Sequence, residues 1–154
     1  MKELRRILLA EDNPKDIELT IEALIDNNLA NIVDVVNDGV EVLEYLRCEG
    51  KYFERKSGNP AVLLLDLKMP KMGGIEVLQA IRSETKLKML PVVILSSSRE
   101  EQDLIRTYEL GINAYVVKPV GFKDFTEAVK NIGIFWAILN ELPPEGKPKN
   151  DSAK

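Results

Sequence analysis

Residues 61–70, with the sequence AVLLLDLKMP, constrain the fold more than any other stretch of the chain. Four consecutive apolar residues, 62–65, lead directly into Asp66, and Met69-Pro70 ends the run. A short apolar run between turn signals is typical of a strand buried on both faces, as in a parallel sheet. Such a strand places its last residue at the carboxyl edge of the sheet, where open α/β folds bind ligands. Asp66 is therefore a candidate site residue, although a lone Asp could also simply cap the next turn.

A second stretch, RRILLAEDN at residues 5–13, repeats this pattern. Its apolar centre is followed by two acids, Glu11 and Asp12. A lone acid after one strand is readily explained as a cap of the following turn. Acids after two strands of the same kind are harder to explain in this way. We therefore interpret Glu11, Asp12 and Asp66 as parts of one site.

Strand-like and helix-like segments alternate five times along the chain. In the first helical segment, Ile17, Ile21, Leu24 and Ile25 have helical spacing and are expected to face inward. The alternation predicts an α/β fold with a parallel sheet covered on both faces. Right-handed crossovers leave few topologies, and the flavodoxin-like (βα)5 strand order 2-1-3-4-5 suits five such units. The expected strands lie near residues 5–10, 31–37, 61–66, 90–98 and 113–121.

The chain is expected to form one domain over residues 1–142. Residues 50–60 form a polar connection that is longer than most in such folds. Residues 143–154 contain turn formers and charges but no core residues, so we expect a mostly disordered tail.

Composition excludes several classes of function. The chain has 154 residues, 45% of them hydrophobic, and a net charge of −4 without a basic stripe, so we expect no nucleic-acid binding. No apolar run approaches the ~20 residues of a membrane span, and Cys48 is the only cysteine, which fits a cytoplasmic location. The chain has no histidine, which excludes a histidine base, histidine metal ligands and a phosphohistidine carrier.

In the predicted topology, the carboxyl ends of the first, third, fourth and fifth strands lie side by side. Three carboxylates at this edge need a cation, or one of them must stay protonated. Oxygen ligands without His or Cys favour Mg²⁺ as that cation. A lysine charge and a serine hydroxyl beside them suit an incoming phosphoryl group, with Asp66 as the nucleophile. The residues brought together are Glu11, Asp12, Asp66, Ser96 and Lys118.

These residues resemble the receiver domain of two-component response regulators. The acid pair, the sequence DLKMPKMGG at residues 66–74, Ser96 and Lys118-Pro119 follow the first, third, fourth and fifth strands in the order of that family. The similarity covers about residues 4–140. It implies a phosphoacceptor protein that catalyses its own phosphotransfer and slow dephosphorylation rather than an enzyme acting on other substrates.

The resemblance also implies a role for each matching residue. Asp66 would be phosphorylated, Asp12 would bind Mg²⁺ directly, Glu11 would assist through water, and the backbone carbonyl of Lys68 would complete the protein ligands. Ser96 and Lys118 would each contact a phosphoryl oxygen. Tyr115 matches the aromatic switch residue that turns inward when Ser96 moves, and Lys118-Pro119 resembles the family's cis peptide. Taken singly, Lys118, Ser96 and Tyr115 could be a surface lysine, a strand cap and an edge aromatic.

A narrower likeness concerns the end of the chain. The long connection at residues 50–60 and the sequence IGIFWAILNELPP resemble regulators paired with bacterial phytochromes. This likeness implies a sensor histidine kinase, of the phytochrome type or another type, as donor, and a homodimer built with the last helix. On that helix, residues 134 and 137 are expected to point away from the core, leaving its end apolar nearly all round. The inward stripe is expected to be Phe122, Phe125, Val129, Ile132, Trp136 and Leu139.

Three other functions use the same fold or the same kind of residue. A haloacid-dehalogenase-type phosphatase needs an acid two residues after its nucleophile, where Lys68 stands. A flavodoxin-like FMN protein needs a phosphate-binding loop after the first strand, where EDNPKD would repel phosphate. A pseudo-receiver that acts only by protein interaction would not need the complete set of acids, serine and lysine.

Overall fold

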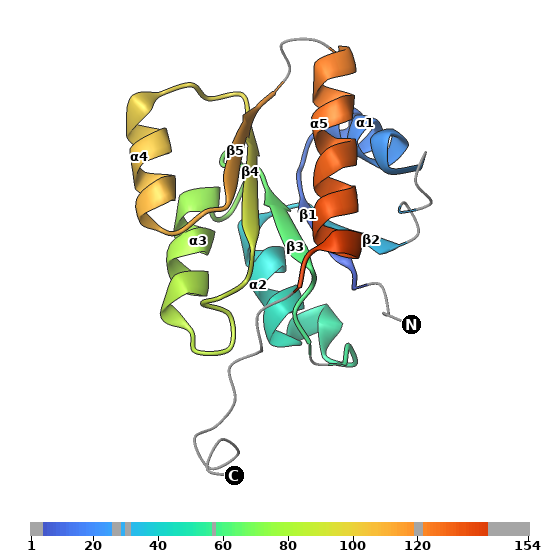
Figure 1. Ribbon diagram of the computed structural model, residues 1–154. Coiled ribbons are helices and arrows are strands. Elements are labelled where there is room, and N and C mark those ends of the chain that lie inside the picture. Colours follow the sequence, from blue (N-terminus) through green and yellow to red (C-terminus); the bar gives the residue numbers. More distant parts are fainter. Residues whose placement is uncertain (1–4, 26–28, 30–31, 57, 119–121, 142–154) are drawn as a thin grey trace.

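The computed structural model describes residues 5–25, 29, 32–56, 58–118 and 122–141 (Figure 1). Its five strands are all parallel and lie in the order β2-β1-β3-β4-β5, which confirms the predicted fold class. The strands are β1 (Ile7–Ala10), β2 (Val33–Val36), β3 (Val62–Leu65), β4 (Val92–Ser96) and β5 (Ala114–Val117). The helices are α1 (Pro14–Ile25), α2 (Gly39–Arg47), α3 (Gly74–Ser83), α4 (Glu101–Glu109) and α5 (Phe122–Ile134). The expected tail and the Lys118-Pro119 peptide lie outside the described residues.

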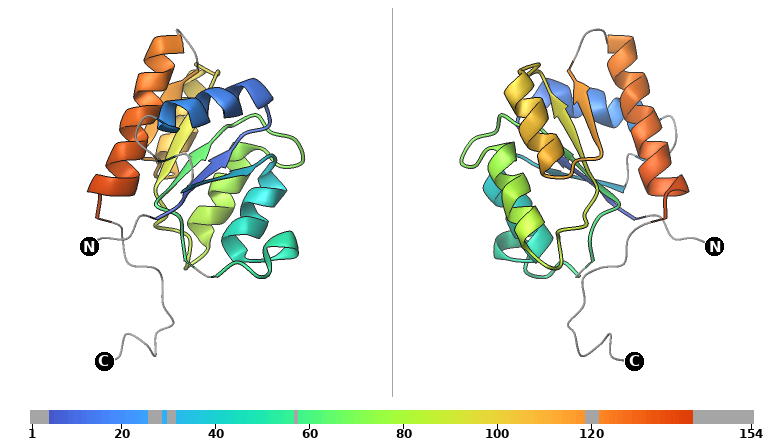
Figure 2. Two further views of the ribbon diagram at one scale, coloured as in Figure 1. Left: turned by 90° about the vertical axis from the view of Figure 1, so that its right-hand side faces the viewer. Right: turned by 60° about the vertical axis from the view of Figure 1, so that its left-hand side comes forward.

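Helices cover both faces of the sheet (Figure 2). Side chains along a strand point alternately to opposite faces, so each central strand serves two cores. Ile7 and Leu9 of β1 pack with residues of α1 and α5, whereas Leu8 and Ala10 pack with residues of α2 and α3. This double burial is the reason that the central strands are continuous apolar runs.

The register of the sheet sets the positions of the strand ends. Ala10 pairs with Leu65, so Glu11 and Asp66 leave the sheet side by side. The backbone N–H of Asp66 donates to the carbonyl of Ala10 at 3.1 Å, which continues the ladder one residue beyond β3. The two acid-bearing strands thus end at the same level, as the sequence predicts.

Two helices differ from the expected inward stripes. In α1, Leu24 is fully buried, while Ile25, one residue and about 100° further round the helix, is 54% exposed. The end of α5 continues as a π-helical turn, Phe135–Leu139, closed by a 2.7 Å bond from Asn140 N to the Phe135 carbonyl. The wider π turn shifts the phase of the side chains. As a result, Ala137 is buried and Leu139 is 66% exposed, the reverse of the prediction.

The long connection before β3 has structure of its own. It begins with a 3-10 turn, Gly50–Tyr52, and lies against α2. The Tyr52 hydroxyl donates to Glu41 Oε2 at 2.6 Å, and Arg55 Nε donates to the carbonyl of Tyr45 at 2.8 Å. The connection is therefore fixed to the fold by side-chain hydrogen bonds.

Candidate functional site

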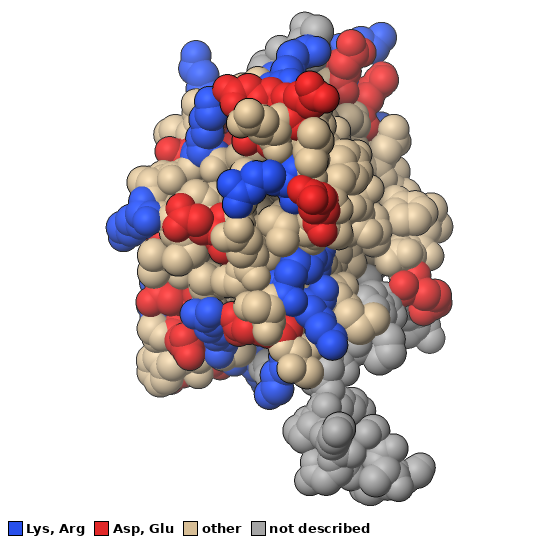
Figure 3. All heavy atoms as spheres, turned by 90° about the vertical axis from the view of Figure 1, so that its left-hand side faces the viewer, with Lys and Arg blue, Asp and Glu red and all other residues tan. Residues whose placement is uncertain are grey.

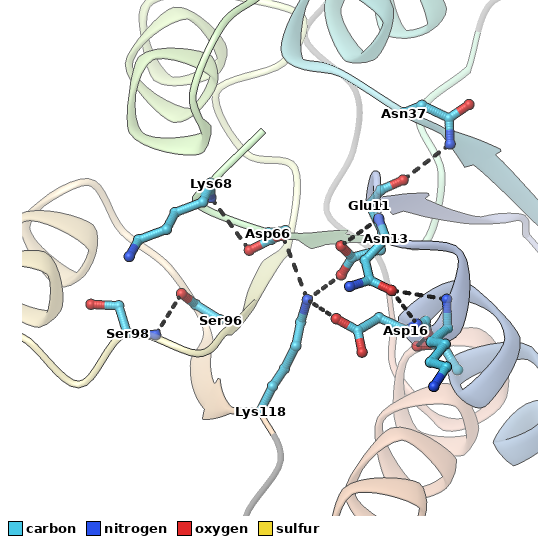
Figure 4. A network of polar contacts seen from close by, with 11 residues as sticks. Glu11, Asn13, Asp16, Asn37, Asp66, Lys68, Ser96, Ser98 and Lys118 are labelled. Carbon is cyan, nitrogen blue, oxygen red and sulfur yellow. Dashed lines mark hydrogen bonds and ion pairs between the residues drawn. The ribbon is translucent and has the colours of Figure 1, made fainter. Parts of the chain in front are cut away.

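Lys118, the first residue after β5, is the centre of the acidic edge (Figure 4). Its side chain is buried, and its Nζ contacts Glu11 Oε1, Asp16 Oδ2 at 3.1 Å and Asp66 Oδ2 at 3.5 Å. Three different segments thus supply carboxylates to one ammonium group. The sheet register accounts for Glu11 and Asp66, and the first turn of α1 supplies Asp16.

Glu11, Asp12 and Asp66 each offer a carboxylate oxygen, and these oxygens lie within 4.8 Å of one another. Glu11 and Asp66 are buried, whereas Asp12 is exposed at the rim. All three line a depression of about 460 Å³ together with Lys68 and Lys118. A hard divalent cation prefers such oxygen ligands, so the residues present fit the metal that the sequence predicts.

The buried charges of this site affect one another's ionisation. Burial raises the pKa of Glu11 to about 7, although the hydrogen bond and the charge of Lys118 oppose this rise. Burial by itself lowers the pKa of Lys118, but the hydrogen bond with Glu11 and the charge of Asp66 outweigh it and hold that pKa above its usual value. The raised pKa of Lys118 reflects the carboxylates around its ammonium group, whereas that of Glu11 reflects mainly its burial.

The β3–α3 loop holds Lys68 beside Asp66. The backbone N–H of Lys68 donates to Asp66 Oδ1 at 3.3 Å, and Lys68 is one of the residues that line the depression. Gly74 allows this tight turn, because a Cβ there would lie 2.5 Å from the carbonyl oxygen of Asp66. The role predicted for the Lys68 carbonyl stays a prediction.

Ser96, the last residue of β4, is fully buried and does not line the depression, whereas Ser97 does. Ser96 Oγ accepts a 3.1 Å hydrogen bond from the backbone N–H of Ser98. Tyr115 is half-buried, and its hydroxyl donates to the carbonyl of Ser98 at 2.9 Å. Ser96 and Tyr115 therefore meet at Ser98 rather than directly.

Three residues of the site were not predicted from the sequence: Asn13, Asp16 and Ser97. Asn13 Oδ1 accepts hydrogen bonds from the backbone N–H groups of Lys15 and Asp16, so it caps the start of α1. Asn directly before a segment with helically spaced apolar residues is a typical N-cap residue, so this role was predictable from the sequence. An acid in the first helical turn, four residues after Asp12, was the available signal for Asp16.

Away from this edge, charges of both signs are interspersed on the face formed by α3 and α4 (Figure 3). No helix in the described ranges combines the length and the apolar character that a membrane span requires.

Comparisons with known proteins agree with the site. Residues 7–130 match the response regulator receiver domain family. Response regulator Rcp1 of Synechocystis sp. is 37% identical over 137 residues, which cover 89% of this chain and 92% of Rcp1. A Mn²⁺-bound structure of Rcp1 covers 91% of this chain and 99% of its own, with a TM-score of 0.82 and 36% identity.

Two further solved structures are similar. The phosphorylated cyanobacterial phytochrome response regulator RcpA has a TM-score of 0.84 and 40% identity, and the match covers 92% of this chain and all of RcpA. The bacteriophytochrome response regulator AtBRR is 58% identical with a TM-score of 0.73, over 91% of this chain and all of AtBRR. With this family match and these relatives, the chain belongs to the response regulator receiver domains.

Proposed function

We propose that Asp66 accepts a phosphoryl group from a sensor histidine kinase and that phosphorylation changes the surface which the protein presents to its partners. The observation that carries this proposal is the position of Asp66. Its carboxylate lies in a depression, 3.5 Å from the buried Lys118 ammonium and beside Glu11 and Asp12. Receiver domains take their phosphoryl groups from histidine kinases, and this chain, without histidine, cannot be its own donor.

In the proposed reaction, an Asp66 oxygen attacks phosphorus as the bond from phosphorus to the donor imidazole nitrogen breaks. The nitrogen keeps the electron pair of that bond, so no further reactant is needed. Lys118 offsets the charge of the phosphoryl oxygens. The Ser96 hydroxyl, which does not line the depression before phosphorylation, moves to donate a hydrogen bond to one of them. Slow hydrolysis of the acyl phosphate by water returns the protein to its starting state.

We propose Mg²⁺ as the metal of this site. Asp12 and Asp66 would hold it directly with the Lys68 carbonyl, and Glu11 would act through water. When bound, it supplies positive charge against the three carboxylates and the incoming phosphoryl group. The oxygen-only donor set and the Mn²⁺-bound structure of Rcp1 support a divalent cation here.

A phytochrome-type histidine kinase is the proposed donor, and the proposed domain spans residues 1–142. RcpA is named a phytochrome response regulator and AtBRR a bacteriophytochrome response regulator, and these names support this donor. The family match over residues 7–130 supports the domain bounds. Because histidine kinases use cytoplasmic ATP, we place the protein in the cytoplasm.

We further propose a homodimer through the end of the last helix. The π-helical turn exposes Phe135 by 47%, Ile138 by 38% and Leu139 by 66%, and an exposed cluster of this kind usually marks an interface. Changing Ile138 and Leu139 to Asp should yield monomers in sedimentation across a micromolar dilution series. Ile105→Asp, at a residue of α4 that is 52% exposed, is the control and should leave the dimer intact. Wild-type monomer at every concentration would contradict the dimer.

Phosphorylation itself is tested with acetyl phosphate and mass spectrometry. Wild-type protein should gain one phosphoryl group only with Mg²⁺, and Asp66→Asn should gain none. Asp12→Ala should require more Mg²⁺, because one metal ligand is lost. Asp124→Asn, at an exposed aspartate of α5, should behave like wild type. Undiminished labelling of Asp66→Asn would show that the phosphoacceptor is another residue.

A further inference from the structure

Asp16 is a carboxylate of the site that has no role in the proposed reaction. It stands in the first turn of α1, 102 residues from Lys118 in the chain. Its Oδ2 nevertheless accepts a 3.1 Å hydrogen bond from the Lys118 ammonium (Figure 4). The Lys118 side chain is 5% exposed and that of Asp16 is 24% exposed. The hydrogen bond therefore links a buried ammonium to a carboxylate nearer the solvent.

The backbone of α1 fixes the position of Asp16. Asn13 Oδ1 caps the helix and accepts from the backbone N–H of Asp16 at 3.3 Å. The buried Thr20 hydroxyl donates to the Asp16 carbonyl at 2.7 Å, about one turn further along the helix. An acid in the first turn is also favoured by the positive end of the helix dipole. Because its backbone is held on both sides, Asp16 is a fixed point from which Lys118 can be held.

The ammonium group of Lys118 has three N–H donors, and two of them are in use. They donate to Glu11 Oε1 and Asp16 Oδ2. Among the described residues, the third carboxylate near the ammonium is that of Asp66, whose Oδ2 forms an ion pair with it at 3.5 Å. Figure 4 shows Asp16 and Asp66 on different sides of the ammonium. The third N–H is therefore left for the side of Asp66, where a phosphoryl group would lie.

Of the two carboxylates that accept hydrogen bonds from Lys118, Asp16 is the one that a metal would not share. In the part of the chain that the structure describes, the acids that fit a metal are Glu11, Asp12 and Asp66. A bound cation would attract Glu11 and Asp66 and would compete with Lys118 for them. Asp16 would then be the carboxylate that still holds the ammonium.

We propose that Asp16 is a positioning residue that anchors Lys118 while the metal site is filled, so that the ammonium is in place before the phosphoryl group arrives. An anchored lysine loses little rotamer freedom on binding, and this preorganisation strengthens binding. The negative charge of Asp16 also repels the phosphoryl group, so anchoring and repulsion act in opposite directions. This inference rests on the proposed function of Asp66.

Two substitutions separate anchoring from charge. Asp16→Asn removes the charge but keeps an oxygen that can accept from Lys118, whereas Asp16→Ala removes both. The affinity for beryllofluoride, a phosphoryl analogue, is measured by calorimetry at saturating Mg²⁺. Asp16→Asn should bind it at least as tightly as wild type, because the repulsion is gone and the anchor remains. Asp16→Ala should bind it about fivefold more weakly than Asp16→Asn, the factor that immobilising one long side chain on binding typically produces.

Titration with Mg²⁺ alone distinguishes anchoring from general damage to the site. Asp16→Asn and Asp16→Ala should bind Mg²⁺ with the same affinity, because they have the same charge and Asp16 is not one of the proposed ligands. Glu18→Asn and Glu18→Ala are the matched controls, at an exposed acid of the same helix. These two control variants should bind beryllofluoride equally well.

Three results would overturn the anchoring role. Equal beryllofluoride affinities of Asp16→Asn and Asp16→Ala, or tighter binding by Asp16→Ala, would do so while leaving the function of Asp66 intact. A loss of Mg²⁺ affinity in Asp16→Ala as large as its loss of beryllofluoride affinity would also do so, because the substitution would then affect the whole site. If wild type does not bind beryllofluoride with Mg²⁺, the proposed function of Asp66 fails, and the anchoring role fails with it.

Discussion

Replacing Asp66 by Asn should make the metal-free protein more stable, although Asp66 is the proposed phosphoacceptor. Its carboxylate lies within 4.8 Å of oxygens of Glu11 and Asp12, and 3.5 Å from the Lys118 ammonium. At an effective dielectric of about 20, the repulsion of Asp66 by Glu11 and that by Asp12 each destabilise the fold by at least about 3.5 kcal/mol. The attraction between Asp66 and Lys118 stabilises it by about 4.7 kcal/mol. At the full 4.8 Å the difference favours Asn by about 2 kcal/mol. Solvent at the exposed Asp12 screens part of the repulsion and reduces this value.

Thermal unfolding at pH 8 without Mg²⁺ measures this effect, because most of Glu11 is then ionised. For a chain of this size, about 2 kcal/mol corresponds to a Tm increase of about 4–8 °C. Asp124→Asn, the same change at an exposed position, should shift the Tm by much less. Millimolar Mg²⁺ should raise the Tm of wild type more than that of Asp66→Asn, because only wild type keeps all three carboxylates. A lower Tm for metal-free Asp66→Asn would refute this reasoning, since the attraction to Lys118 would then outweigh both repulsions.

Three further predictions concern turnover, backbone strain and pH. If the Lys68 side chain shields the acyl phosphate from water, Lys68→Ala should lose its phosphoryl group faster than wild type in a mass-spectrometric time course, and an unchanged rate rejects shielding. Cys48 caps α2 at a left-handed φ of 56°, so Cys48→Gly should raise the free energy of unfolding in urea by about 1 kcal/mol, and a decrease would contradict it. Burial raises the pKa of Asp34, but hydrogen bonds from Arg6 and Tyr45 outweigh it and lower that pKa below its usual value. Its stabilisation relative to Asp34→Asn should be complete above the ordinary carboxyl pKa of about 3.9 and disappear as the pH falls through the lower folded value, whereas a difference independent of pH would exclude this linkage.

The fold and the acidic edge could be predicted from the sequence because both depend on short-range patterns. Continuous apolar runs such as Val62–Leu65 require burial on both faces, and helices between them require parallel strands. Parallel strands end at one edge, so Glu11, Asp66 and Lys118 had to meet there. The prediction was wrong where the helical period changed, because a π turn in Phe135–Leu139 exchanged the exposures of Ala137 and Leu139.

The sequence by itself determined which residue types stand at the ends of the strands, and with them the chemistry that the site supports. Only the tertiary structure decided the partners of those residues. Asp16 reaches Lys118, 102 residues away, and Ser98 joins Ser96 to Asp103 and Tyr115. Such bonds depend on the angle at which a helix leaves its strand and on the rotamer of each side chain. Packing across the whole domain sets both, and no local pattern in the sequence contains them.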